Sequence, residues 1–220
     1  MFRLLRPSIV ALLGIAIFPQ LVGAAPSVGD ALKLSPVQEN IAYDTPAADK
    51  IASSTIKAEK INDVTAWVVR DPDNKILREF ADSNKDNVVD TWSYFRDGLE
   101  VYRDIDSNFN GKADQYRWFH SDGIRWALDS DEDNVIDSWK LISPEEVAAE
   151  VIEALSAKDS KRFERLLVTA EDIKKLGLDA ARVDQLQKRV SAAAEKFGSV
   201  TTDASLKPGF AFSDFGGVRP

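Results

Sequence analysis

Between Ile61 and Ile142 the sequence alternates between short apolar, aromatic-rich runs and polar turn signals. Residues rich in β-formers recur at 65–69, 91–95 and 115–119, and after each a turn signal leads into a second such run, at 75–80, 99–102 and 124–128. Two of these turns are Asp-Gly pairs, at 97–98 and 122–123, which favour hairpins because both turn residues must reach positive φ. The pattern predicts three consecutive hairpins closed by residues 138–142, which together form an antiparallel meander.

Alternation along these runs predicts which side chains share a face. Trp92, Tyr94 and Arg96 lie on one face of their strand, and Tyr116, Trp118 and His120 lie on one face of theirs. Two interpretations follow for the aromatic residues. They either form the core of a thin sheet, or they form an exposed strip that stacks on sugar rings or on a partner surface.

After residue 142 the hydrophobic period changes to that of helices. Ser143, Pro144 and Glu146 form a capping box with proline at the first helical position, which predicts a helix to about Ala157. Further helices are expected at 160–167, from Thr169 to Gly177, and from Asp179 to Gly198. Their short connections predict a small helical domain over residues 143–198, followed by a flexible tail at 199–220.

The first 60 residues are expected to lie outside the sheet. Arg3 and Arg6, an apolar run at 9–18 and small residues before Ala25 are typical of a secretory signal peptide at 1–24. The apolar run is too short for a good membrane span, although an uncleaved anchor is the alternative. The protein is therefore expected to be secreted, periplasmic or part of the cell envelope. Residues 25–60 show no period and are expected to be an extended or disordered lead-in, with a short helix at 47–53.

The sequence thus predicts an α+β protein. A β-hairpin repeat domain at 61–142 carries acidic loops, and a small helical domain follows it.

Three acidic segments repeat one nine-residue pattern inside the predicted meander. They read DSNKDNVVD at 82–90, DSNFNGKAD at 106–114 and DSDEDNVID at 129–137. Oxygen-bearing side chains fill positions 1, 3, 5 and 9 of every copy, Asn or Gly fills position 6, and Val, Ala or Ile fills position 8. A repeat this regular predicts one structural role for all three copies.

This pattern suits a calcium loop. Calcium takes six to eight oxygen ligands, which a short loop can supply from alternate positions if the main chain turns sharply between them. Asn or Gly at position 6 tolerates the left-handed conformation of such a turn, and position 8 would anchor the loop to a core. Position 7 (Val88, Lys112, Val135) would offer a backbone carbonyl, and the middle loop, with two carboxylates, is expected to bind most weakly. The predicted side-chain ligands are Asp82, Asn84, Asp86 and Asp90; Asp106, Asn108, Asn110 and Asp114; Asp129, Asp131, Asp133 and Asp137.

Through position 9 the segments resemble the EF-hand loop, D-x-[DN]-x-[DN]-G-x5-E. They depart from it at position 12, where Ser93, Arg117 and Lys140 replace the bidentate Glu. The resemblance is to the wider class of EF-hand-like and thrombospondin type 3-like calcium repeats of secreted proteins, and it implies two or three bound Ca²⁺ ions. A water or an acid from elsewhere would supply the missing ligand, with Asp97, Asp104 and Asp122 as candidates. The alternative is that the segments are Asp- and Asn-rich turns without metal.

Charge favours the metal interpretation. Residues 71–137 hold 17 acidic against 8 basic residues, a net charge of −9, whereas the whole chain carries −8. Such a concentration of negative charge repels itself unless cations neutralise it. The acidic chain, with a pI near 4.8, is not expected to bind nucleic acid.

The residue inventory excludes several kinds of active site. One histidine and no cysteine exclude histidine-rich zinc sites and disulfides, and no serine–histidine nucleophile motif occurs. Repeated acids occupy equivalent environments, whereas a catalytic pair needs different ones, so no enzyme activity is expected. The sequence predicts an exported calcium-binding repeat protein with a structural, adhesive or scaffolding role and a polysaccharide or protein partner. The alternatives are a carbohydrate- or cell-wall-binding module that uses exposed Trp and Tyr, and an acid-dependent glycoside hydrolase.

Overall fold

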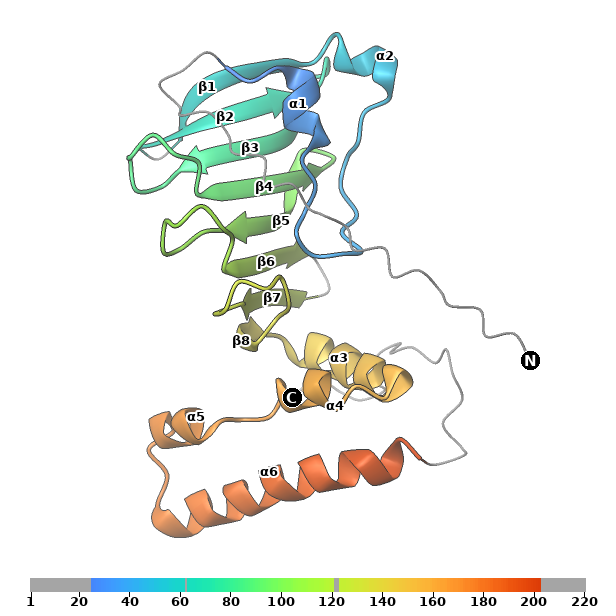
Figure 1. The fold of residues 1–220 in the computed structure, drawn as a ribbon, viewed down its shortest axis with the longest axis vertical. Coiled ribbons are helices and arrows are strands. Elements are labelled where there is room, and N and C mark those ends of the chain that lie inside the picture. Colours follow the sequence, from blue (N-terminus) through green and yellow to red (C-terminus); the bar gives the residue numbers. More distant parts are fainter. Residues whose placement is uncertain (1–24, 62, 121–122, 203–220) are drawn as a thin grey trace, which may run out of the picture.

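A computed structural model describes residues 25–61, 63–120 and 123–202. Within these residues the chain forms one antiparallel sheet of eight strands, in which each strand neighbours the next in sequence (Figure 1). This confirms the predicted α+β class and the meander. The strands are β1 Thr55–Ile61, β2 Val64–Arg70, β3 Ile76–Asp82, β4 Thr91–Arg96, β5 Leu99–Ile105, β6 Gln115–His120, β7 Gly123–Leu128 and β8 Ser138–Ile142. The sheet therefore begins before residue 61, where the sequence placed its start, because β1 pairs along its whole length with β2.

Aromatic side chains form the centre of the core on one face of the sheet. Tyr94, Tyr102 and Trp118 are direct cross-strand neighbours and are 2 %, 0 % and 5 % exposed. The ring centroids of Tyr102 and Trp118 lie 5.1 Å apart in an edge-to-face arrangement, a geometry worth about 0.5–1.5 kcal/mol beyond burial. Tyr116 is also fully buried. Of the two interpretations of these rings, the structure supports the core.

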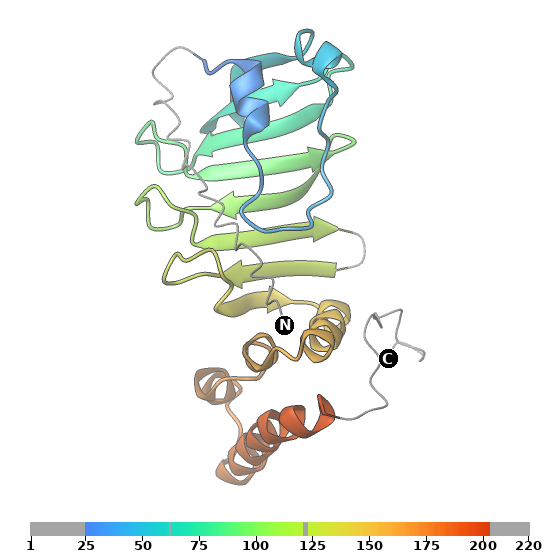
Figure 2. The same cartoon turned by 45° about the vertical axis from the view of Figure 1, so that its right-hand side comes forward.

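The segment before β1 packs across this aromatic face (Figure 2). Helix α1 (Val28–Lys33) buries Leu32 against Trp67 and Phe80, and residues 34–47, here called the strap, place Val37, Ile41 and Tyr43 against the aromatic cluster. The lead-in was expected to be extended or disordered; residues 34–47 form neither helix nor strand, but they pack against the sheet. Its apolar residues have no period because each fills a separate site on the sheet. Helix α2 (Ala48–Ile51) matches the expected short helix.

A buried arginine holds the strap at its far end. Arg78 of β3 is 0 % exposed, and its Nη1 donates to the carbonyl oxygens of Asp44 (2.9 Å) and Leu77 (2.6 Å). Its guanidinium carbon lies 4.4 Å from the ring centroid of Tyr43 and 5.2 Å from that of Tyr94. Burial lowers the pKa of Arg78. The two rings supply cation–π contacts that partly replace the lost water.

Four helices follow the sheet: α3 Pro144–Ala157, α4 Ser160–Glu164, α5 Ala170–Lys175 and α6 Ala180–Val200. Each begins at a residue whose side chain accepts a hydrogen bond from the first turn, as the sequence predicted for Ser143, Thr169 and Asp179. Helix α4 ends earlier than expected, and α6 continues two residues past Gly198, into the segment expected to be a tail.

Ion pairs join the helices to the last strands. Arg125 of β7 contacts Glu146 (3.1 Å) and Glu150 (3.0 Å) of α3, and the buried Glu150 also contacts Arg162 of α4 (2.7 Å). Glu150 and Arg125 each have two partners, so this network joins α3 to both β7 and α4.

Two predicted segments fall outside the described residues: the signal peptide at 1–24 and the tail from residue 203 onward. In the part of the chain that the structure describes, no helix combines the length and apolar character needed to span a bilayer.

Candidate metal centre

The three acidic loops, residues 82–90, 106–114 and 129–137, lie together at one end of the sheet (Figures 1 and 2). Each follows an odd-numbered strand and leads into the next strand, β3 to β4, β5 to β6 and β7 to β8. The meander therefore places all three loops on one side and the Asp97-Gly98 turn on the other, as the sequence predicted. Main-chain hydrogen bonds join neighbouring loops, because the Asp106 N–H donates to Asp90 and the Asp129 N–H donates to Asp114 (2.8 and 2.9 Å).

The carboxylate at position 1 organises each loop. Asp82, Asp106 and Asp129 are nearly fully buried, and each accepts hydrogen bonds from the N–H groups of positions 5 and 6. In the third loop these donors are Asp133 (3.3 Å) and Asn134 (2.9 Å). The turn is thereby closed by its own first side chain.

The main chain bends at two residues in every loop. Position 6 has positive φ as predicted, at Asn87 (71°), Gly111 (92°) and Asn134 (69°). Position 4 also has positive φ, at Lys85 (68°), Phe109 (62°) and Glu132 (59°), which the sequence did not indicate. Such a conformation is uncommon for these side chains, and the hydrogen bonds to position 1 hold it.

Positions 2 and 9 close the base of each loop. The Asp at position 9 accepts the N–H of the Ser at position 2: Asp90 from Ser83 (2.9 Å), Asp114 from Ser107 (3.0 Å) and Asp137 from Ser130 (2.8 Å). The serine was not singled out from the sequence, although its presence in all three copies was the available signal. Position 8 anchors the loop as predicted, since Val89, Ala113 and Ile136 pack on the core clusters.

The third loop brings carboxylates together. Asp129, Asp131 and Asp137 each offer an oxygen, and these oxygens all lie within 4.8 Å of one another. Asp129 is buried, whereas Asp131 and Asp137 are exposed, so the group opens to solvent on one side. Desolvation, and then the negative charges of Asp133 and Asp137, raise the pKa of Asp131. A cation placed among these oxygens would relieve that repulsion.

Two contacts support the third loop from outside. The Tyr116 hydroxyl donates to Asp129 (2.6 Å), and burial together with this contact raises the pKa of Tyr116. The Gln38 side-chain amide of the strap donates to the Asn134 carbonyl oxygen (2.9 Å). The sequence gave no signal for Gln38, because the contact depends on how the strap packs.

In the first and middle loops, side chains at positions 3 and 5 bind other groups. The Asn84 amide donates to Asp86 (2.9 Å) in the first loop. In the middle loop Asn108 and Asn110 both donate their amides to Glu132 of the third loop (2.9 and 2.5 Å). Among the described residues, only the third loop gathers three carboxylates in the manner above, and the other predicted ligands stay predictions.

Asp97 and Asp104, two of the acids proposed to replace the Glu ligand at position 12, both bind other groups. Asp97 sits in the β4–β5 turn at the opposite end of the sheet and pairs with Lys75 (3.3 Å). Asp104 is buried beneath the strap, where it accepts the Tyr102 hydroxyl (2.5 Å) and the Val37 N–H (3.2 Å). Burial raises its pKa to about 7. Asp122 lies outside the described residues.

Comparison with protein families, with curated proteins and with solved structures finds no match to this chain. The function is therefore inferred from the geometry of the loops.

Proposed function

We propose that this chain is an exported calcium-binding structural protein, in which Ca²⁺ held by the acidic loops stiffens one end of the sheet. The convergence of Asp129, Asp131 and Asp137 supports this proposal most strongly. Their loop is already closed around Asp129, so binding needs little rearrangement of the main chain.

The donor set favours calcium over other metals. Every candidate ligand is an oxygen, which disfavours zinc, and magnesium demands a near-ideal octahedron that an open, irregular loop does not offer. In the third loop, Asp133 and the Val135 carbonyl would add to the three carboxylates, and water would complete the shell. Without a bidentate Glu at position 12, dissociation constants of about 10⁻⁴ to 10⁻³ M are expected.

The other two loops extend the proposal with lower expected affinity. In the first loop Asp86 would exchange its contact with Asn84 for the ion. In the middle loop Asn108 and Asn110 would release Glu132, and this loop offers two carboxylates. It is therefore expected to fill last, as affinity rises with the number of charged ligands.

Calorimetric titration of the chain from Ala25 with CaCl₂ tests the proposal, with Asp131→Asn as the informative variant. Asp131 is exposed, so its substitution leaves the packing of the loop intact. The loss of one carboxylate ligand is expected to weaken binding at the strongest site roughly tenfold.

Asp97→Asn is the matched control, because it removes an exposed carboxylate at the opposite end of the sheet. It should leave calcium affinity unchanged. Equal weakening by both variants would show that calcium responds only to overall negative charge. An absence of binding heat at millimolar calcium, with an unchanged circular dichroism spectrum, would leave the loops as metal-free turns.

The glycan-binding alternative would need an accessible aromatic strip. Tyr94, Tyr102 and Trp118 are buried under the strap, so they can reach a sugar ring only if the strap leaves the sheet. This observation favours the structural calcium proposal over the alternative.

A further inference from the structure

A second row of aromatic and charged side chains runs across the sheet face opposite the strap. Here Arg103, Arg117 and Trp126 are cross-strand neighbours on β5, β6 and β7. Cations and rings alternate along this row. Centroid distances are 5.5 Å from Arg103 to Phe119, 4.8 Å from Arg117 to Phe119, 4.6 Å from Arg117 to Trp126 and 3.8 Å from Lys140 to Trp126. These five residues are called the cationic row.

Of the three cations in the cationic row, only Arg103 forms an ion pair with a described acidic residue. Arg103 is paired with Glu100 through two hydrogen bonds of 2.7 and 2.8 Å. Arg117 and Lys140 have no ion-pair partner among the residues that the structure describes, although the chain as a whole carries −8. The Arg117 Nε is buried without a hydrogen-bond partner, an unfavourable state for a charged donor. This part of the face therefore favours an anionic ligand.

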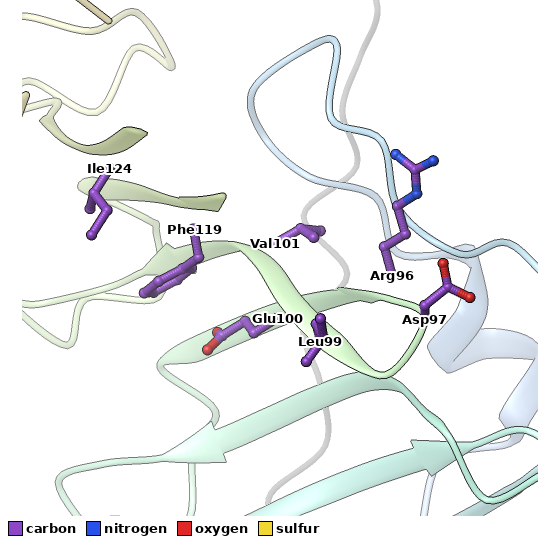
Figure 3. A pocket seen from close by; sticks show the side chains of 7 residues that line it. All are labelled: Arg96, Asp97, Leu99, Glu100, Val101, Phe119 and Ile124. Carbon is purple, nitrogen blue, oxygen red and sulfur yellow. The ribbon is translucent and has the colours of Figure 1, made fainter. Parts of the chain in front are cut away.

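An open surface cavity, with a mostly apolar lining, adjoins the cationic row at the end of the sheet that holds the turn of residues 97–98 (Figure 3). It measures about 570 Å³ and is lined by Arg96, Asp97, Leu99, Glu100, Val101, Phe119 and Ile124. Phe119 belongs to both the cavity and the row. Leu99 is 73 % exposed and Ile124 is 43 % exposed, so apolar surface is open to solvent at its mouth. The two acids of the lining are paired, Glu100 with Arg103 and Asp97 with Lys75.

We propose that this face binds an acidic segment of a partner protein, which inserts one large apolar side chain into the cavity and sets carboxylates against Arg117 and Lys140. The charge of the row and the apolar lining of the cavity match this chemistry. An acidic glycan matches it less well, because Arg117 and Lys140 already cover the Trp126 ring on which a sugar would stack. The cavity lies at the end of the sheet away from the acidic loops, whereas Arg117 and Lys140 each lie three residues after a predicted calcium ligand, Asp114 and Asp137.

Fluorescence anisotropy with the chain from Ala25 onward tests the proposal. The probe is a labelled dodecapeptide of Asp and Glu with one central Phe. Binding is expected to weaken as salt rises, and to weaken about 5- to 10-fold with Lys140→Gln, which removes one charge from an exposed position. Replacing the peptide's Phe by Ser should also reduce binding, because the cavity would lose its occupant.

Lys161→Gln on α4 is the matched control and should leave the peptide affinity unchanged. Arg117→Gln provides a second readout, provided that its thermal unfolding matches that of the parent chain. Equal binding by the parent, Lys140→Gln and Arg117→Gln chains would overturn the proposal. Tighter binding of an oligogalacturonate than of the peptide, lost in Lys140→Gln, would replace the protein partner by an acidic glycan.

Discussion

One carboxylate holds two bends in each acidic loop. Asp129 accepts hydrogen bonds from the main-chain N–H groups of Asp133 and Asn134. These bonds hold the turn in which Glu132 and Asn134 have positive φ. A side chain such as Glu132 rarely adopts this conformation alone. Single polar residues thus determine the path of the main chain, whether or not a metal is bound.

Glu79 is predicted to contribute to the response to pH, in addition to the buried Asp104. Burial, and then the neighbouring charge of Glu100, raise the pKa of Glu79 above its ordinary value of 4.5. The folded state therefore holds this proton more tightly than the unfolded chain does. The stability that protonated Glu79 contributes is present below the unfolded pKa, and it is lost as pH rises through the folded pKa.

Glu79→Gln cannot ionise, so this variant should match the parent near pH 4 and become more stable than the parent as pH rises toward about 7. The urea midpoint at each pH measures this difference. Glu195→Gln, at an exposed position of α6, should follow the parent at every pH. Parallel curves for the parent and Glu79→Gln would contradict the prediction. The other charged groups that act on Glu79 are Arg103, Glu59 and Arg70.

At the scale of elements, the N-terminal segment completes the core. Trp67 and Phe80 are buried in one cluster with Ala31 and Leu32 of α1. The strap continues this cover across the aromatic cluster to the Tyr43–Arg78 contact. A sheet with one covered face needs such an element, because a single layer cannot bury its apolar side.

Leu32→Ala is predicted to destabilise the folded state by about 2–4 kcal/mol, as expected for a leucine removed from a core. Denaturant unfolding followed by tryptophan fluorescence measures the change. Leu176→Ala removes a leucine that is 58 % exposed and should alter stability by no more than about 0.5 kcal/mol. Similar small effects from both substitutions would mean that α1 contributes nothing to the core.

The extent of sequence-based prediction differs among these elements for physical reasons. The hairpins and most helices carry local signals, namely alternation, Asp-Gly turns and capping residues, and these were located correctly. The strap was not, because Val37, Ile41 and Tyr43 have no period and gain order only from the sheet. In the loops the repeat predicted the bend at position 6, whereas the bend at position 4 depends on hydrogen bonds that residue type does not reveal.

In the whole molecule, the three acidic loops are joined to one another at one end of the strands. The second and third loops each donate a main-chain hydrogen bond to the loop before them, so order in one loop restrains its neighbour. The helical end is joined through Glu150 to β7, the strand that leads into the third loop. A ligand at this loop therefore acts on the sheet and, through β7, on the helices.

Calcium is accordingly predicted to stabilise the entire fold. At about one hundred times the dissociation constant, one site that binds only the folded state adds about 2.7 kcal/mol. Hydrogen exchange should slow most in the acidic loops and the adjoining strand ends, and least at the turn of residues 97–98. Magnesium at the same concentration is the control and should have a smaller effect. Uniform slowing with both ions would indicate general screening of charge.

The length of the sheet depends on the number of repeated units. A unit of loop, strand, turn and strand takes 23 residues from Asp106 to Leu128, and its strands pair only with those of the neighbouring units. Neighbouring strands lie about 4.8 Å apart, so each unit lengthens the array by about 10 Å. Duplication or loss of one unit in a gene would change the length of the sheet in steps of that size, and the strap, which reaches from β4 to the third loop, would have to change with it.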